Sequence, residues 1–346
     1  MIGVASVLGP FTGGWIVDHT SWRWVFLVSL PVGLLALAVV FATLRIPAHP
    51  DRERDVDYVG AGMLVVGVSA LLLATVWGGA LYPWGSAHVV GAFVGGAAVL
   101  ALFARHERRV AHPIVPVSLF RDRVVTGACL AGFSVGVGMF GAIMFVPLFV
   151  QGALGASATN SGVALTPLML GMILTSVASG QVIARTGRYR WALLAGPLVM
   201  AMGFVSLATL NESSALASAV VATIVLGLGL GLLMQNLVLV VQNAAPTRSL
   251  GAATGATRFF RQIGGTLGVT VMGAILAAGL PAGAAATSAG EHGTAANPAT
   301  IAGAIHPVFV LGVPLMALTL ALVATIPERP LRRAVRDDVT PAPSAA

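Results

Sequence analysis

Polar side chains within long apolar segments are the residues of this sequence best placed to do chemistry. Gln235 and Asn236 lie in the apolar run 214–243, and Arg258 and Arg261 lie in the first turns of the next one. A buried amide needs hydrogen-bond partners, so the two amides either join neighbouring helices or contact a bound molecule. The two arginines either extend to the lipid headgroups or act as a gate.

Methionine and phenylalanine side chains form a second group of candidates. Phe140 and Met144 lie in the apolar run 124–150, and Met169 lies in the run that follows it. Such side chains can repack around apolar molecules of different shapes. They are also typical of ordinary helix packing and of surfaces that face lipid. The sequence leaves both interpretations open for these three residues.

Catalysis is not indicated. No carboxylate lies in the middle of an apolar run, the histidines show no ligand spacing, and no zinc motif or nucleophile elbow is present. The glycines at 227, 229 and 231 lie inside an apolar run with no strand before them, so they predict helix packing rather than a dinucleotide site. The sequence therefore predicts no catalytic residue, no metal and no cofactor.

Composition sets the fold class. Hydrophobic residues make up 57% of the 346 residues and charged residues only 9%, against roughly 25% charged in soluble domains. Several apolar runs reach the ~20 residues with which a helix crosses the hydrocarbon core. We therefore expect an all-α polytopic membrane protein. Its membrane helices are predicted over about 1–18, 22–44, 58–78, 88–104, 124–150, 159–184, 191–210, 214–243, 250–280 and 302–326.

The positive charges lie on one side of this arrangement. The cations are 19 arginines and no lysine, and the formal net charge is +7. An even number of spans puts both termini on one side, and every arginine except Arg23 falls on that side. Cytoplasmic loops are enriched in arginine, so we assign this side to the cytoplasm. Nucleic-acid binding would need a solvated basic face instead, so no nucleic-acid partner is expected.

The first predicted helix carries small residues at regular spacing. Gly9 and Gly13 share one helix face, with Pro10 and Gly14 on the adjoining row, so a neighbouring backbone can approach closely. Together with the Trp-Arg-Trp sequence at 22–24, this glycine-proline motif resembles the major facilitator superfamily, in particular its fourteen-helix drug:proton antiporters. The resemblance implies that the motif belongs to the family's fifth helix and is associated with export. It also implies that about four helices would precede residue 1.

A second string with the same resemblance lies in a predicted cytoplasmic loop. It keeps the family's glycines and two of its arginines, at Gly180, Arg185, Gly187 and Arg188, with alanine in place of the acidic residue. Gly187 permits a tight turn, and the arginines can bind helix carbonyls or lipid phosphates. Short cytoplasmic loops attract arginine in any case, so a purely topological role is the alternative.

The resemblance also divides the chain into parts of one fold. These parts are residues 1–44 as the last two helices of the N-terminal bundle, 45–57 as a cytoplasmic loop, 58–104 as the extra helix pair of fourteen-helix members, 105–123 as a second cytoplasmic loop, 124–326 as the C-terminal six-helix bundle, and 327–346 as a cytoplasmic tail.

The function that the resemblance implies is proton-coupled efflux of hydrophobic or cationic drugs by alternating access. The partners would be a small-molecule substrate, protons and the lipid bilayer, with the proton gradient as the energy source. The family's proton-carrying carboxylate lies in its first helix, outside this sequence. The arginine-only cations and abundant alanine, glycine and valine indicate a GC-rich bacterial genome. With the resemblance, this leads us to expect a bacterial inner membrane, with both termini of the chain in the cytoplasm. The alternatives are export of a lipid or secreted metabolite, or a truncated remnant or subunit that does not transport.

Overall fold

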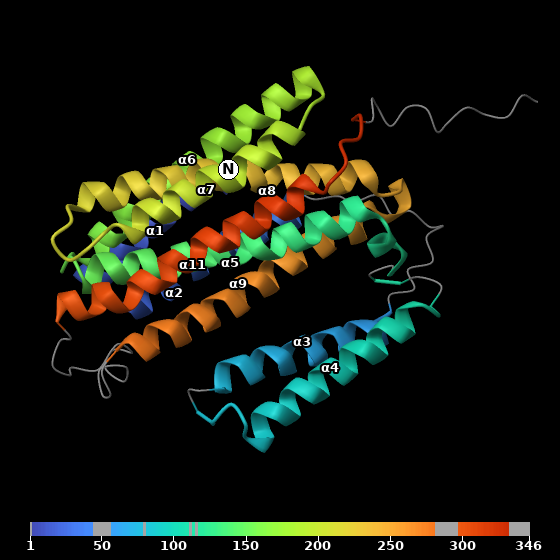
Figure 1. The fold of residues 1–346 in the computed structure, drawn as a ribbon, viewed down its shortest axis with the longest axis horizontal. Coiled ribbons are helices and arrows are strands. Elements are labelled where there is room, and N and C mark those ends of the chain that lie inside the picture. Colours follow the sequence, from blue (N-terminus) through green and yellow to red (C-terminus); the bar gives the residue numbers. More distant parts are fainter. Residues whose placement is uncertain are drawn as a thin grey trace, which may run out of the picture.

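The computed structural model describes residues 2–43, 57–78, 81–110, 113–114, 117–280 and 297–331, which form ten long helices without a strand (Figure 1). The helices are α1 (Ile2–His19), α2 (Trp22–Thr43), α3 (Tyr58–Trp77), α4 (Ala87–Glu107), α5 (Arg123–Gly152), α6 (Ala158–Thr186), α7 (Arg190–Ala208), α8 (Leu216–Ala244), α9 (Leu250–Gly279) and α11 (Pro298–Ala324), with short 3₁₀ helices η1 (Val117–Arg121) and η2 (Thr247–Ser249). Most of the predicted loop 45–57 and most of the predicted tail lie outside the described residues.

Nine of these helices, all except α1, are long and apolar enough to cross a membrane. The helix α1 has 18 residues, and it ends on Asp18 and His19, which lower its mean hydropathy. The helices α5 and α9 have 30 residues each, or about 45 Å of length, which exceeds the ~30 Å of the hydrocarbon core. The prediction of an all-α polytopic membrane protein is confirmed.

The hydrophobic core lies among α5–α9 and α11. Its buried residues run from Leu119 to Ile326, and no described residue of α1–α4 belongs to it. The helix α5 packs most closely against α9 and also against α11, and α8 packs against α6 and α7. These elements form one elongated bundle (Figure 1). The division of the chain into bundles stays a prediction, which this core supports.

Glycines bring the core helices into backbone contact. A Cβ atom at Gly264 of α9 would overlap the carbonyl group of Phe133 on α5, and one at Gly227 of α8 would overlap the carbonyl group of Leu168 on α6. Membrane helices associate through such close approaches because lipid provides no hydrophobic drive between them. The glycines at 229 and 231 are equally close to neighbouring helices, so the packing role predicted for these α8 glycines is confirmed.

The remaining helices are peripheral. The helix α1 packs on α6, and α2 packs mainly on α1 and buries none of its residues. The helices α3 and α4 form a hairpin, in which Gly67 and Gly96 let the two backbones approach. This hairpin lies beside α9 and makes few contacts with it (Figure 1).

Substitution of Gly264 by alanine should destabilise the bundle, because the new methyl group would force α5 and α9 apart. Overpacking of this kind costs about 1–3 kcal/mol. The matched control is Gly255→Ala on the same helix, where a Cβ would meet no atom within 4 Å and helix propensity should improve by about 1 kcal/mol. The thermal unfolding midpoint in detergent measures both, and equal midpoints for the two variants would contradict the proposed contact.

Candidate functional site

The predicted substrate-facing residues differ in exposure. Met144 of α5 has 57% of its surface exposed and Gln235 of α8 is also exposed, whereas Phe140 of α5 and Met169 of α6 are half-buried. The Phe140 ring lies against α9, where a Cβ at Gly265 would collide with it. Met144 and Gln235 are therefore the two of these side chains most accessible to a bound molecule, and their contact with substrate stays a prediction.

Asn236 is instead part of a helix contact. It is buried on α8, and its side-chain Nδ2 donates to Ser179 Oγ of α6 at 3.2 Å and to the Leu232 carbonyl at 2.7 Å. These bonds satisfy both hydrogens of the amide. The structure thus favours the first of the two roles considered for this residue, that of joining helices.

The two arginines of α9 lie close together in sequence but differ in their surroundings. Arg258 is exposed and Arg261 is half-buried, and the Arg261 carbonyl lies where a Cβ at Gly136 would be. Neither guanidinium forms an ion pair with a described residue. The gate role and the contact with lipid headgroups stay the two predictions for these arginines.

Gly187 makes the turn that the sequence predicts. It ends α6 in the left-handed conformation with φ of 71°, and its N–H donates to the Ile183 carbonyl at 2.8 Å. Arg185 and Arg188 are exposed on either side of it. Gly180 is exposed within α6 and has open space beside it, so a role in helix packing is not seen there.

Tyr189, which follows this string, has a role that the sequence did not reveal. Its ring is buried, and its hydroxyl accepts a hydrogen bond from the Arg329 backbone N–H at 2.7 Å. The Arg329 guanidinium binds both oxygens of Asp122, at 2.8 and 3.2 Å. These contacts tie together the start of α5, the start of α7 and the segment after α11. The only sequence signal was Asp122 itself, which caps α5 by accepting from the Val124 N–H.

Two glycines of the glycine-proline motif have open space beside them among the described residues. A Cβ at Gly9 or at Gly13 would meet no atom within 4 Å, and Gly14 is half-buried; the side chain of Pro10 lies outside the described set. The helix α1 does pack on α6, so it does so through positions other than these two glycines. A pivot role for the motif stays a prediction.

Asp18, near the end of α1, binds the start of α6. Its Oδ2 accepts from the Thr159 backbone N–H at 2.8 Å and also from the Thr159 hydroxyl. A carboxylate at a helix N-terminus satisfies N–H groups that have no partner within the helix. This contact therefore links the glycine-proline helix to the core bundle at one end.

A contact between a carboxylate and an imidazole joins the two ends of the α3–α4 hairpin. Asp57 caps α3 through the Gly60 N–H at 2.8 Å and binds His106 Nε2 at 3.0 Å. The bond from the Gly60 N–H, together with His106, lowers the pKa of Asp57 below its usual value of 3.8. Glu107, the last residue of α4, is buried and accepts from the Ile114 N–H at 3.0 Å.

The carboxylates of the described residues all lie at helix ends or in connections. Asp18 and Glu107 are in the last turns of their helices, Asp57 and Asp122 are caps, and Glu212 lies between α7 and α8. Glu328 follows α11. Within the described ranges no group of three or more metal-binding side chains comes together.

The family is decided by comparison with known proteins. The sequence profile of the Major Facilitator Superfamily matches residues 1–269. The chain belongs to the major facilitator superfamily. This family consists of transporters, so the prediction of a transporter fold rather than an enzyme is confirmed.

Several curated relatives are similar over most of this chain. Multidrug transporter protein MdtP of Bacillus subtilis is 41% identical over 79% of this chain and 50% of its own length. An uncharacterised MFS-type transporter of Mycobacterium tuberculosis is 39% identical over 80% of this chain and 40% of its own. Multidrug resistance protein 3 of B. subtilis is 31% identical over 80% of this chain and 53% of its own length. This major facilitator chain thus spans about half the length of the curated relatives that it matches.

Loss of the Asp18 carboxylate should loosen both α1 and the start of α6. A lost N-cap costs about 1 kcal/mol, or roughly a five-fold increase in local opening. In Asp18→Ala, hydrogen–deuterium exchange should rise by about that factor in peptides from both segments. The control is Ser157→Ala, which removes the bond from the Asn160 N–H and should affect only α6. Unchanged exchange of α1 in Asp18→Ala would show that the contact does not hold the two helices together.

Proposed function

We propose that this major facilitator chain is part of an efflux transporter that exports hydrophobic or cationic drugs in exchange for protons. The observation that carries the proposal is its similarity to relatives named as multidrug transporters, at 41% and 31% identity. The sequence contributes the glycine-proline motif, which the family associates with export. The membrane in question would be a bacterial inner membrane.

The contact between α1 and α6 supports an alternating-access mechanism. If 1–44 belongs to the N-terminal bundle and 124–326 to the C-terminal bundle, this contact joins the two bundles. Asp18 binds Thr159 at one end of the contact, whereas Gly9 and Gly13 have open space. A polar bond at a helix end can break and re-form as two bundles rock, because water can replace either partner.

The substrate-binding surface would include Met144 of α5 and Gln235 of α8. Both are exposed although their helices belong to the core bundle. A flexible thioether and a neutral amide suit apolar molecules of varied shape, whereas a fixed carboxylate would select one charge.

Proton coupling requires a group that changes protonation within the membrane. Intramembrane carboxylates are the usual proton carriers of transporters. The described carboxylates lie at helix ends or in connections, and several are engaged in caps or ion pairs. We therefore place the proton-carrying group outside the described residues, with the proton gradient as the energy source and no cofactor.

Drug accumulation tests the proposal in bacteria that lack their own exporters. The probe is ethidium, and the compared proteins are this chain and a version extended upstream to the length of the relatives. The extended version should lower ethidium accumulation several-fold, and an uncoupler should abolish the difference. Efflux by the short chain alone with the same uncoupler sensitivity would overturn our placement of the proton site. If neither version exports any drug but the extended version exports a lipid or metabolite, that compound replaces drugs as the proposed substrate class. If neither version exports anything, the result favours a subunit that does not transport.

Membrane orientation gives an independent prediction. With both termini cytoplasmic, the connection after α7 faces outward and the end of α6 faces inward. In a Cys129→Ala background, Ser213→Cys should react with a membrane-impermeant maleimide on intact cells, and Thr186→Cys should react only after permeabilisation. Both residues are exposed on the protein, so the side of the membrane on which each lies decides whether the maleimide can reach it. The reverse pattern would refute the assignment from arginine distribution.

A further inference from the structure

The turn between α3 and α4 carries a group of aromatic side chains that contact one another. The Tyr82 ring stacks on the His88 ring with 4.6 Å between centroids, and it meets the Trp77 ring edge-on at 6.2 Å. The Trp84 ring packs on Gly78, where a Cβ atom would overlap it. Tyr82 and Trp84 are nevertheless exposed, Trp84 over 51% of its surface. The turn therefore presents a fixed apolar surface to its surroundings.

The lengths of the two helices place this turn relative to the membrane. The helices α3 and α4 are membrane spans of 20 and 21 residues, or about 30 Å at 1.5 Å per residue, which equals the thickness of the hydrocarbon core. Residues 58–104 contain no aspartate, glutamate, lysine or arginine, whereas Asp57 and Arg105 flank them at the opposite end of the hairpin. With that charged end at one membrane surface, the aromatic turn lies at the other boundary of the hydrocarbon.

Backbone and side chains of the turn prefer different surroundings. The N–H groups of Leu81 and Tyr82 both donate to the Trp77 carbonyl at 3.0 Å, but a turn also has peptide groups that need water or headgroups as partners. The Leu81 side chain, exposed over 69% of its surface, and the rings of Tyr82 and Trp84 favour apolar contact instead. The glycerol and carbonyl layer of a bilayer satisfies both requirements, and Trp and Tyr are enriched there.

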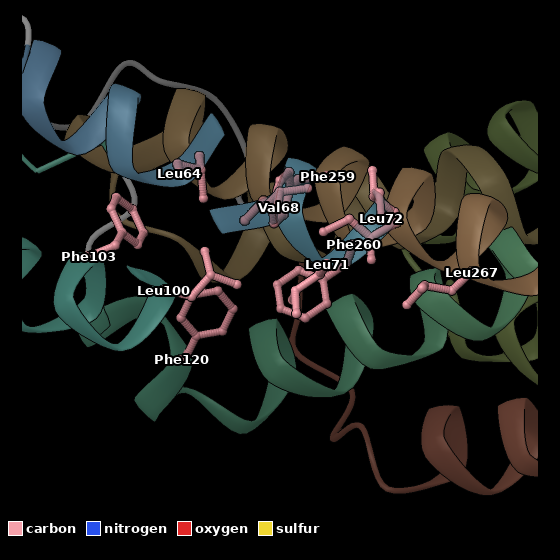
Figure 2. A pocket seen from close by; sticks show the side chains of 12 residues that line it. Leu64, Val68, Leu71, Leu72, Leu100, Phe103, Phe120, Phe259, Phe260 and Leu267 are labelled. Atoms are coloured by element: carbon pink, nitrogen blue, oxygen red, sulfur yellow. The ribbon is translucent and has the colours of Figure 1, made fainter. Parts of the chain in front are cut away.

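Packing against the bundle gives the hairpin little support. An apolar cleft of about 220 Å³ lies between the hairpin and α9, and Val68 of α3, Phe103 of α4 and Phe260 of α9 are among the side chains that line it (Figure 2). The direct contacts between α3 and α9 are few. The depth of the hairpin in the membrane therefore needs another determinant.

We propose that the aromatic turn is an interfacial anchor, which binds the glycerol and carbonyl layer of the bilayer and sets the depth of the α3–α4 hairpin. Its binding surface consists of Leu81, Tyr82 and Trp84, and it continues the lipid-facing surface of the two spans. The anchor acts on whichever side of the membrane the turn lies, and it is independent of drug transport and of the proton site.

Spin labelling in phosphatidylcholine vesicles tests where the turn lies. In a Cys129→Ala background, a nitroxide on Leu81→Cys should be accessible to oxygen and several-fold less accessible to a water-soluble nickel chelate than a nitroxide on Ser213→Cys. Ser213 is the matched control because it is exposed in the connection after α7, beside Glu212. Equal access of the chelate to both labels would overturn the proposal. So would a Leu81→Cys label shielded from oxygen and chelate alike, which would show that protein covers the turn.

A second set of variants tests whether the turn sets the depth of the hairpin. Leu81→Asp adds a charge without removing a ring contact, and it should draw the turn toward water. A label on Leu73→Cys, exposed on α3, should then lose oxygen access relative to chelate access several-fold. Leu81→Trp should leave that ratio unchanged.

A label on Val221→Cys, exposed on α8 of the core bundle, is the control and should not respond to either substitution. If Leu81→Asp does not give monodisperse protein, Leu81→Gln replaces it. The same ratio at the Leu73→Cys label in the polar and the Trp variants would overturn the anchor, as would an equal shift of the Val221→Cys label.

Discussion

The close contact between α5 and α9 is the interaction on which the arrangement of the bundle depends. It is reciprocal: Gly136 of α5 lies against the Arg261 carbonyl, and Gly264 of α9 lies against the Phe133 carbonyl. Within hydrocarbon the helices already satisfy their own backbone hydrogen bonds, so only packing and side-chain bonds can hold them together. Backbone-to-backbone approach gives the densest packing, and the same device recurs at Gly227 between α8 and α6.

The polar contacts of the protein follow the same constraint. Charged partners lie at helix ends, where water and lipid headgroups lower the cost of charge. Among the described residues, the side chains paired between helix interiors are neutral, such as Ser134 with Thr319 at 2.7 Å between α5 and α11, and Asn236 with Ser179. The middle parts of the helices are thus held together by close packing. The helix ends are held together by polar bonds that water can replace.

The periphery is packed differently from the core. The helix α2 buries none of its residues, and the α3–α4 hairpin touches α9 through a wall of apolar side chains around a cleft. In the described structure these elements are therefore mostly exposed. The dense core lies in 119–326, and the described residues of α1–α4 lie outside it.

The sequence by itself determined nine of the ten predicted membrane helices, the turn at Gly187, the packing role of the α8 glycines and the family, because each of these depends on local composition, spacing or a contiguous motif. Tertiary structure decided the partners. Asn236 proved to join α8 to α6, Tyr189 proved to bind the segment after α11, and the space beside Gly9 proved to be open. Helical periodicity fixes which residues share a face, but it does not say which helix lies opposite that face. Nor could the apolar cleft be foreseen, since it depends on how closely a hairpin and a distant helix approach.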